Sequence, residues 1–456
     1  MVRGSPPSPA QAITQASRSR LLRRWLCQQT LVRQEAESGM LVQSILNRIQ
    51  KQPGFVYGSA RLVEVRQRPA LEIELRARKN RRARCSVCQK PAPGYDTLSP
   101  RRFEFVPLWG LLVFFIYALR RVKCPRCGVR VEVVPWAEGK HQLTTTYAWF
   151  LARWAKRLSW TAVAESFHTS WTHVYRSVEM AVAWGRAHQD LSGITAIGFD
   201  EIQWHRGHHY LTLVYQIDAH CRRLLWVGQE RTVKTALGFF RWFGRPRTAT
   251  LRFVCSDMWK PYLKVIAQKA PHALHILDRF HIAAHMSKAI DQVRAEEVRS
   301  LKARGLQPVL TKTRWLLLKR SENLTPGQLP KLAQLLAHNL RAVRAYLLKE
   351  EFQFFWGYIS PGWAGRFLDS WCKQARRSRI EPMKKVAAML TGHRSLLLNW
   401  FRAGGLISSG AVEGFNNHAK LTMRKSFGFR TFPVIELALF HTLGKLPEPE
   451  TSHSFF

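Results

Sequence analysis

The sequence pattern changes at Ile194, and this change constrains the fold more than any other feature of the chain. Before it, apolar residues recur at the spacing of helix faces, and after it they gather in short runs typical of buried strands. The runs predict strands at 194–202, 209–217, 223–228, 250–256 and 273–277, with a helix before the fourth. An opening meander followed by strands that alternate with helices predicts an α/β domain with a mixed sheet.

Two aspartates follow strands of this domain. Asp200 lies at the end of the first strand, and Asp257 lies just past the fourth. The RNase H-like fold has this order of elements. If the first and fourth strands are neighbours, the two carboxylates meet at one edge of the sheet. An aspartate after a strand is also a common helix-capping residue, and that alternative stays open for each of them.

A third acid, Glu413, lies far downstream, after the glycine-rich joint at Gly404 and Gly405. If the run from Ser408 onward is a helix, one face is polar and carries Glu413, Asn416, Asn417, Lys420 and Arg424. The other face carries Val412, Phe415, Ala419 and Met423. We expect the apolar face to pack on the sheet edge and the polar face to present the acid. A solvated glutamate is the alternative.

Three carboxylates in this arrangement are suited to hard divalent cations. Asp200, Asp257 and Glu413 offer the oxygen ligands that Mg²⁺ or Mn²⁺ prefers. Two such ions can activate the attacking oxygen and stabilise the leaving oxygen of an in-line displacement. The polar residues that follow Glu413 on its helix face would then hold phosphates of the strand being cut.

The charge of the chain indicates a polyanionic partner. Lysine and arginine number 71 against 30 aspartates and glutamates, a formal net charge of +41. Such self-repulsion is most simply tolerated for nucleic acid, although a ribosome-associated or membrane-surface protein is the alternative. Residues 1–16 lack the apolar core of a secretory signal, and Arg18, Arg20, Arg23 and Arg24 follow them. The apolar segment 105–119 is too short to cross a membrane and is interpreted as buried strands.

Four of the eight cysteines form two CxxC pairs. Cys85 and Cys88 make one, Cys124 and Cys127 the other, and Gly128 follows as tight metal turns often require. Four thiolates are the ligand set of a structural Zn²⁺ site. The 36 positions from Cys88 to Cys124 exceed the usual spacing, so the site requires a hairpin that brings the pairs together. Four unrelated buried thiols are the alternative. The paired pattern suits a reducing cytoplasm.

A helix-turn-helix is expected between the cysteines and the mixed sheet. A first helix carries Tyr147, Phe150, Leu151, Trp154 and Leu158 at helical spacing, Ser159 caps a second that starts at Trp160, and a third starts near Trp171. Its inner face would carry Trp171, Val174, Tyr175, Val178 and Val182, which leaves Thr172, His173, Arg176 and Ser177 pointing outward. These positions suit a recognition helix in the major groove. A helical bundle that only links domains is the alternative.

These features divide the chain into seven parts. They are a basic N-terminal segment at 1–80, a zinc-binding module at 81–137, a helix-turn-helix at 138–190, the first part of the catalytic core at 191–284, a helical insertion at 285–403, the last part of the core at 404–445, and a tail at 446–456. The role of residues 1–80 is not readable from their pattern.

The chain resembles the ISL-three (ISL3) family of bacterial insertion-sequence transposases over roughly residues 80–445. The resemblance rests on the two cysteine pairs and on the motifs at 198–201, 206–212, 257–262, 278–281, 412–417 and 427–430. It implies an RNase H-like DDE core with a helical insertion, in which Asp200, Asp257 and Glu413 form the triad. Asp278 and His281 belong to one of these motifs and are expected to have a supporting role, with a cap and a packed histidine as the alternative.

The resemblance implies a bacterial cytoplasmic, nucleoid-associated enzyme that binds the ends of its element and target DNA, cuts and joins strands with two Mg²⁺ or Mn²⁺ ions, and assembles as a homo-oligomer on DNA. Its zinc and helix-turn-helix parts would recognise the ends, and no membrane partner is expected. Two rivals remain: a transposase-derived DNA-binding protein that no longer cuts, and another nuclease of the same fold, such as a junction resolvase.

Overall fold

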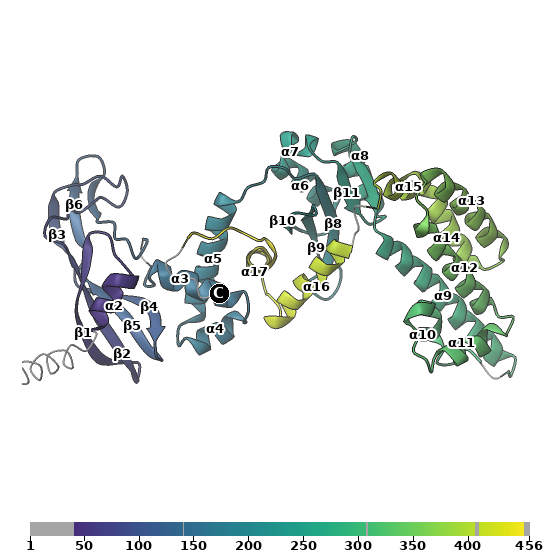
Figure 1. Cartoon of the computed structure of the whole chain (residues 1–456), viewed down its shortest axis with the longest axis horizontal. Coiled ribbons are helices and arrows are strands. Elements are labelled where there is room, and N and C mark those ends of the chain that lie inside the picture. The colour runs from purple at the N-terminus through teal and green to yellow at the C-terminus, as the bar shows by residue number, and fades with distance from the viewer. Residues whose placement is uncertain (1–40, 140, 307–308, 406–409, 451–456) are drawn as a thin grey trace, which may run out of the picture. The chain divides into compact units, whose positions relative to one another are not determined.

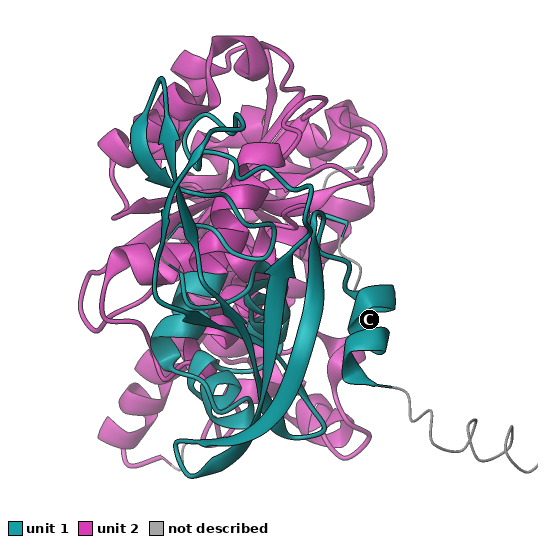
Figure 2. Cartoon of the chain, turned by 90° about the vertical axis from the view of Figure 1, so that its left-hand side faces the viewer, with its two compact units in different colours: residues 1–177, 449–456 teal, residues 178–448 magenta. Residues whose placement is uncertain are grey.

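The computed structural model describes residues 41–139, 141–306, 309–405 and 410–450. The arginines from Arg18 to Arg24, Ser408, Ser409 and the end of the tail lie outside these ranges. The chain divides into two compact units, residues 1–177 with 449–456 and residues 178–448 (Figure 2). The division falls inside one helix, α5 (Trp171–His188).

Unit 1 contains a four-stranded sheet in the order β1-β2-β5-β4, preceded by helix α2 (Val42–Ile49). Its strands are β1 (Phe55–Val65), β2 (Arg68–Ala77), β4 (Arg101–Leu108) and β5 (Leu111–Tyr117). β4 and β5 cover the expected buried strands at 105–119. β2 pairs with β5 in parallel, so residues before position 81 share a sheet with residues after it. The expected boundary at residue 81 therefore does not separate two sheets.

The cysteine pairs belong to a smaller sheet in the same unit, in the order β3-β6-β7. β3 (Gly94–Thr97), β6 (Arg120–Cys124) and β7 (Gly128–Val131) pair antiparallel. The β6–β7 hairpin turns between Cys124 and Gly128, and Gly128 adopts a positive φ of 73°, which glycine accepts without strain. This hairpin holds only the second pair. The apolar hairpin expected between the two pairs is β4–β5, and β3, which follows the first pair, pairs with β6, which ends at Cys124.

Three helices follow, α3 (Thr145–Ala155), α4 (Trp160–Ser166) and α5. The side chain of Ser159 accepts a hydrogen bond from the backbone N–H of Ala162, which confirms the predicted cap of the second helix. His168 has a positive φ of 53° in the break between α4 and α5.

Unit 2 is built on a mixed five-stranded sheet in the order β10-β9-β8-β11-β12. β8 (Ala196–Gln203), β9 (Tyr210–Ile217) and β10 (Arg222–Gln229) form the antiparallel meander, and β11 (Phe253–Ser256) and β12 (Leu274–Leu277) run parallel to β8. All five strands overlap the predicted runs. β8 and β11 are neighbours in the sheet, as the expected meeting of their acids requires.

Helices cover the two faces of this sheet. On one face, Phe199 of β8 packs against Phe239, Phe240 and Tyr262, which come from α6 (Val233–Phe243) and α8 (Lys260–Lys269). The short α7 (Arg245–Ala249) precedes β11. On the other face, α16 (Gly410–Lys425) runs along β8, where a side chain added to Gly198 would collide with Val412 (Figure 1). α17 (Phe432–Leu443) packs on α16 and β10.

The segment between β12 and α16 is helical, as its sequence predicts. Its elements are α9 (Arg279–Ala303), α10 (Arg314–Leu318), η1 (Ser321–Asn323), α11 (Leu329–Leu336), α12 (Arg341–Gln353), η2 (Phe354–Gly357), α13 (Pro361–Arg377), α14 (Glu381–Gly392) and α15 (Arg394–Arg402). They enclose a core of their own around the fully buried Trp371 and Phe355.

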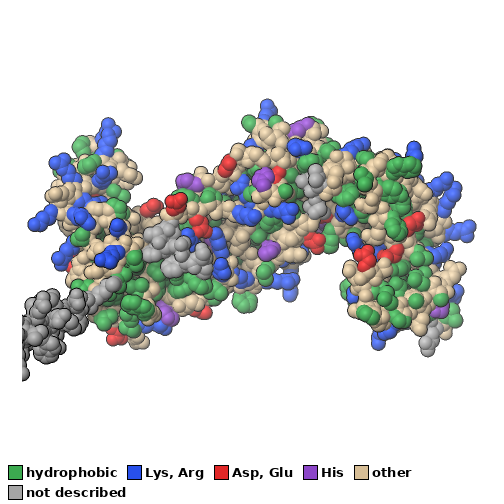
Figure 3. Space-filling view, viewed as in Figure 1, with side chains coloured by type: hydrophobic (Ala, Val, Ile, Leu, Met, Phe, Trp, Pro, Cys, Tyr) green, Lys and Arg blue, Asp and Glu red, His purple; other side chains and the backbone are tan. Residues whose placement is uncertain are grey.

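Basic side chains lie over the surface of both units in the face shown in Figure 3, and acidic side chains are few. The described helices include none that is both long enough and apolar enough to cross a lipid bilayer.

Candidate active site

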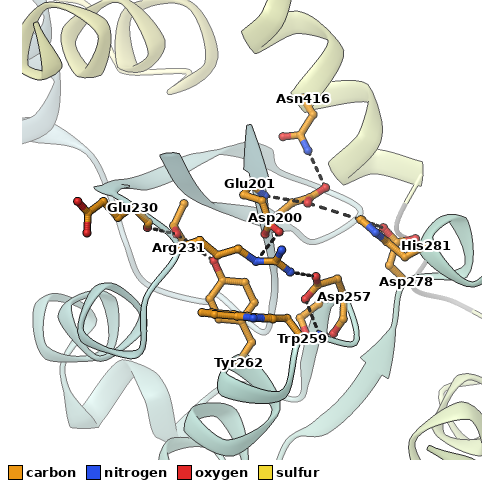
Figure 4. A network of polar contacts seen from close by, with 12 residues as sticks. Asp200, Glu201, Glu230, Arg231, Asp257, Trp259, Tyr262, Asp278, His281 and Asn416 are labelled. Carbon is orange, nitrogen blue, oxygen red and sulfur yellow. Dashed lines mark hydrogen bonds and ion pairs between the residues drawn. The ribbon is translucent and has the colours of Figure 1, made fainter. Parts of the chain in front are cut away.

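Asp200 lies near the end of β8, 7% exposed, with its side chain towards α16. The amide nitrogen of Asn416 donates to Asp200 Oδ2 over 2.6 Å (Figure 4). The Tyr215 hydroxyl donates to Asn416 Oδ1 over 2.9 Å. The stacked rings of Tyr215 and Phe415 hold the same helix against β9. Asp200 and α16 are therefore joined by a buried polar chain.

Asp278 and His281 approach the same carboxylate from the start of α9. Asp278 caps this helix, because its Oδ1 accepts from the backbone N–H of Phe280 over 2.7 Å. His281 Nε2 lies 3.7 Å from Asp200 Oδ1 and 3.7 Å from Asp278 Oδ2. The hydrogen bond to Asp200 is the main cause that raises the pKa of His281 to about 9, so the ring is a cation at neutral pH. Asp278 therefore caps α9, which the sequence had left as an alternative, and His281 also contacts Asp200.

Asp257 lies just after β11, beside Asp200. Cys255 pairs with Gly198, so two residues later Asp257 comes level with Asp200 in the neighbouring strand. The carboxylate is 7% exposed and accepts from the backbone N–H of Trp259 over 3.0 Å. Burial raises its pKa, while the adjacent Arg231 acts in the opposite direction. The register brings the backbones of the two aspartates level at this edge, and a shared metal between their carboxylates stays a prediction.

Glu201 is a fourth acid of the site, and the sequence reasoning missed it. Successive strand residues face opposite sides, so Glu201 points away from Asp200 towards α8. Arg231 Nε lies 2.6 Å from Glu201 Oε1 and a terminal nitrogen of the same guanidinium donates to Asp257. Burial first, and then the charge of Asp257, raise the pKa of Glu201 to about 8. Its only signal in the sequence is its place beside Asp200 in a chain poor in acids.

Arg231 neutralises this side of the site. Its guanidinium carbon lies 4.7 Å from the ring centroid of Trp259, and Glu201 and Asp257 flank it (Figure 4). Glu201 Oε2 is buried and has no hydrogen-bond partner in the described parts of the chain. A buried oxygen without a partner is costly, and a divalent cation or a proton would satisfy it. The oxygen donors around Asp200 and Asp257 thus fit a hard cation.

Glu413 lies in the first turn of α16, three residues before Asn416, on the helix that docks on Asp200. Neighbours at this spacing lie about 5–6 Å apart on a helix. The Glu413 side chain is half-buried and lines a cavity together with Arg279 and Phe280, the residues that precede His281. The described residues offer its carboxylate neither a hydrogen bond nor an ion pair. Asp200, Asp278 and His281 form one of two sets of candidate metal ligands among the described residues, and their ligand atoms lie within 4.8 Å of one another.

The prediction that Asn416 lies on the exposed polar face of α16 is wrong. Asn416 is 7% exposed and faces the sheet, because its amide fits between Asp200 and Tyr215. It therefore cannot contact DNA from this position. Asn417, Lys420 and Arg424 are exposed, as expected.

Cys85, Cys88, Cys124 and Cys127 gather at one place in unit 1, with their sulfur atoms within 4.8 Å of one another. Cys88 Sγ and Cys124 Sγ lie 3.5 Å apart. Hydrogen bonding by the backbone N–H of Arg126 is the main cause that lowers the pKa of Cys124 to about 7, which favours the thiolate that binds metal. The four soft donors fit a Zn²⁺ ion.

The exposed face of α5 is narrower than expected. Thr172 and Arg176 are exposed, whereas His173 is half-buried, with its ring 2.9 Å from Thr169 Oγ1 and 3.5 Å from Glu104 Oε2. Ser177 is 1% exposed and donates to the carbonyl of His173, so its predicted outward direction is wrong. Trp171, expected inside, is 46% exposed and stacks on Tyr175.

Residues 197–439 match the model of a protein family described as transposases. The chain is 29% identical over 350 residues to the transposase for insertion sequence element IS1001 of Bordetella parapertussis, across 76% of this chain and 85% of that protein. It is 30% identical over 401 residues to the transposase for insertion sequence element IS1557 of Mycobacterium tuberculosis, across 81% of this chain and 88% of that protein. The family match runs from β8 to α17 and includes Asp200, Asp257 and Glu413.

Proposed function

This chain belongs to the ISL3 family of insertion-sequence transposases, and on that premise we propose that it binds the terminal inverted repeats of its element and cuts and joins DNA strands with divalent metal ions. Asp200, Asp257 and Glu413 are the proposed metal ligands, with two Mg²⁺ or Mn²⁺ ions as the cofactor. The fold around them is proposed to be an RNase H-like DDE core.

One observation carries the proposal. Asp200 and Asp257 come level on two neighbouring parallel strands, and α16, which bears Glu413, is fixed to Asp200 by the Asn416 amide. This link supports assigning Glu413 to the same site as the two aspartates, because Asn416 of the same helix follows Asp200 by 216 residues in the sequence. A helix that merely packed on the sheet would not need a buried polar link to a carboxylate.

Different residues of the chain are proposed to position the metal ligands and to contact the DNA. When bound, the metal ions supply the activated oxygen nucleophile and the charge that stabilises the leaving oxygen. Asn416 orients the Asp200 carboxylate, and His281 lies 3.7 Å from both Asp200 and Asp278, where it holds the two carboxylates in place. Exposed Asn417, Lys420 and Arg424 extend along α16, where they would contact phosphates of the DNA.

The test is cleavage of DNA that carries the ends of the element. We expect cleavage only with Mg²⁺ or Mn²⁺, and we expect Asp200→Ala, Asp257→Ala and Glu413→Ala each to abolish it while binding of the ends stays measurable. Glu322→Ala is the matched control, because Glu322 is an exposed acid in η1, outside the site.

Robust cleavage by Glu413→Ala alone would show that the third ligand is misassigned. Loss of cleavage in Asp278→Asn would then identify Asp278 as the third ligand. Absence of any cleavage by the unchanged protein, with specific binding intact, would favour the rival DNA-binding protein.

We further propose that unit 1 recognises the ends of the element. Its four clustered cysteines would hold one structural Zn²⁺ ion. Helix α5 would enter a major groove with its first turns, where Thr172 and Arg176 are exposed. Assembly as a homo-oligomer on DNA remains part of this proposal.

A further inference from the structure

A cavity of 350 Å³ lies in unit 2, between the first turns of α9, α12 and the start of α16, and the proposed chemistry assigns no ligand to it. Its charged lining residues are Arg279, Arg320, Lys349 and Glu413. With three cations against one carboxylate, the lining has a net positive charge. The cavity adjoins the active site, since Glu413 lines it and His281 follows its lining residue Phe280.

Lys349 has its hydrogen-bonding capacity filled by the protein. Its ammonium donates to the carbonyls of Leu317, Leu318 and Lys319 over 3.2, 3.3 and 2.8 Å, and it lies 3.1 Å from Glu350 Oε1. It thus ties α12 to the end of α10. The donors left for a ligand are those of Arg279 and Arg320.

Arg279 is held by aromatic rings but has no anionic partner among the described residues. Its guanidinium carbon lies 4.4 Å from the ring centroid of Trp356 and 4.9 Å from that of Trp400, so aromatic faces fix its plane. Burial, and then the charge of Arg320, lower its pKa. Within the described ranges it has neither a carboxylate nor a carbonyl as partner. The two rings offset part of the cost of this half-buried charge, and an anionic ligand would supply the counter-ion that the described residues lack.

The size and lining of the cavity indicate which anion it takes. Its volume falls at the lower end of the range of about 300–1,000 Å³ typical of sites for small ligands. A guanidinium held in one plane offers paired N–H donors that match the oxygens of a phosphate group. Phe280, 53% exposed beside it, offers a ring against which a sugar or base can pack.

We propose that this cavity binds one phosphate of the DNA strand next to the bond that is cut, with Arg279 as its principal ligand and Arg320 as the second. This inference rests on the proposed function, because it takes the strand to lie at Glu413. It assigns to the start of the helical segment a part in holding the substrate.

The test is a thermodynamic cycle between residue and phosphate. Duplexes that carry the end of the element are made with a neutral methylphosphonate at each position around the cleavage site in turn. Their dissociation constants are measured by fluorescence anisotropy without added Mg²⁺ or Mn²⁺, so no strand is cut and the proposed structural Zn²⁺ is retained. At one position we expect the unchanged protein to lose about 10-fold in affinity or more, as for a charged hydrogen bond.

Arg279→Gln should bind the unmodified duplex more weakly than the unchanged protein, by a similar factor. A methylphosphonate at the sensitive position should then cause this variant no additional loss of affinity. Arg279→Lys keeps the charge but not the planar guanidinium. Its affinity for the unmodified duplex should lie between those of the unchanged protein and Arg279→Gln. Arg299→Gln is the matched control, because Arg299 is exposed on the same helix and lies outside the cavity. This variant should lose as much affinity as the unchanged protein when the methylphosphonate is at the sensitive position. Arg320→Gln removes an exposed side chain and should lower the sensitivity at that position without unfolding the helical core.

The inference is overturned if Arg279→Gln, folded as judged by its melting temperature, keeps the sensitivity of the unchanged protein at every position. It is also overturned if no position affects the unchanged protein. Failure of the proposed function gives a different result, namely that the unchanged protein does not cleave these duplexes with Mn²⁺.

Discussion

Asp200 is held by partners from three parts of the chain. Asn416 donates to one of its oxygens, His281 lies 3.7 Å from the other, and the backbone N–H of Glu201 donates to it over 2.8 Å. A carboxylate fixed in this way keeps its oxygens in place for a metal ion before the ion arrives. Preorganisation of this kind is what accurate positioning in an active site requires.

Asn416 and its neighbour Asn417 separate positioning from DNA contact. Asn416→Ala would leave a buried oxygen of Asp200 and the Tyr215 hydroxyl without a partner, so we expect the free energy of unfolding to fall by about 1–3 kcal/mol. Cleavage should fall with it. Urea denaturation without added Mg²⁺ or Mn²⁺ measures the first effect. Asn417→Ala removes an exposed side chain and should change stability by less than about 0.5 kcal/mol; equal losses in both variants would contradict the assignment.

Glu201 makes stability depend on pH. Its pKa is raised from 4.5 to about 8, so the folded protein keeps a proton that the unfolded chain releases, and stability falls as the pH rises through this interval. The pKa of His281 is raised from 6.5 to about 9, so this residue also lowers stability as the pH rises, but only above pH 6.5. Glu201→Gln should therefore flatten the decline in stability between about pH 5 and 6.5, measured from the midpoint of urea unfolding without added Mg²⁺ or Mn²⁺. An unchanged slope would mean that Glu201 is ionised in the folded state.

The elements of unit 2 were largely predictable because their signals are local. Each strand run and the helical segment could be located from apolar spacing, and the strand order brings Asp200 and Asp257 together. The direction of Asn416 could not be predicted, since polarity alone places an asparagine on the outer face of a helix. Its partners Asp200 and Tyr215 lie more than 200 positions away, as in the Tyr215–Asn416 separation of 201. The parallel pairing of β2 with β5 is non-local in the same way.

Helix α5 offers a test at the scale of one element. Thr172 and Arg176 are exposed, whereas His173 contacts Glu104. Replacing Thr172 and Arg176 together by alanine should lower discrimination between the element's ends and random DNA, at about 1–3 kcal/mol for each base that the variant no longer reads. Competition titrations at one salt concentration measure this ratio.

His173→Ala should instead lower the stability of unit 1 and leave the specificity ratio nearly unchanged. Non-specific binding should persist in both variants, because it depends on the distributed positive charge and weakens as salt rises. A specificity ratio unaffected by the double substitution would mean that α5 only packs.

At the scale of the whole molecule, the two units should respond separately to loss of zinc. The cysteine cluster belongs to unit 1, and the proposed catalytic acids belong to unit 2. Cys88→Ser should remove one zinc ion for each chain and expose the β3-β6-β7 region to limited proteolysis, while the fragments of unit 2 stay resistant. Cys221→Ser, outside the cluster, should keep the zinc. Folded protein without zinc would end this interpretation.

The 216 positions between Asp200 and Asn416 also have a consequence for biosynthesis. At synthesis rates of roughly 5–20 residues per second, Asn416 is added about 11–43 s after Asp200. During that interval residues 1–177 of unit 1 have already been synthesised, whereas the acids of β8 and β11 still lack α16. A nascent or prematurely terminated chain is therefore expected to hold DNA without cutting it, and such products would compete with the full-length protein for the same ends.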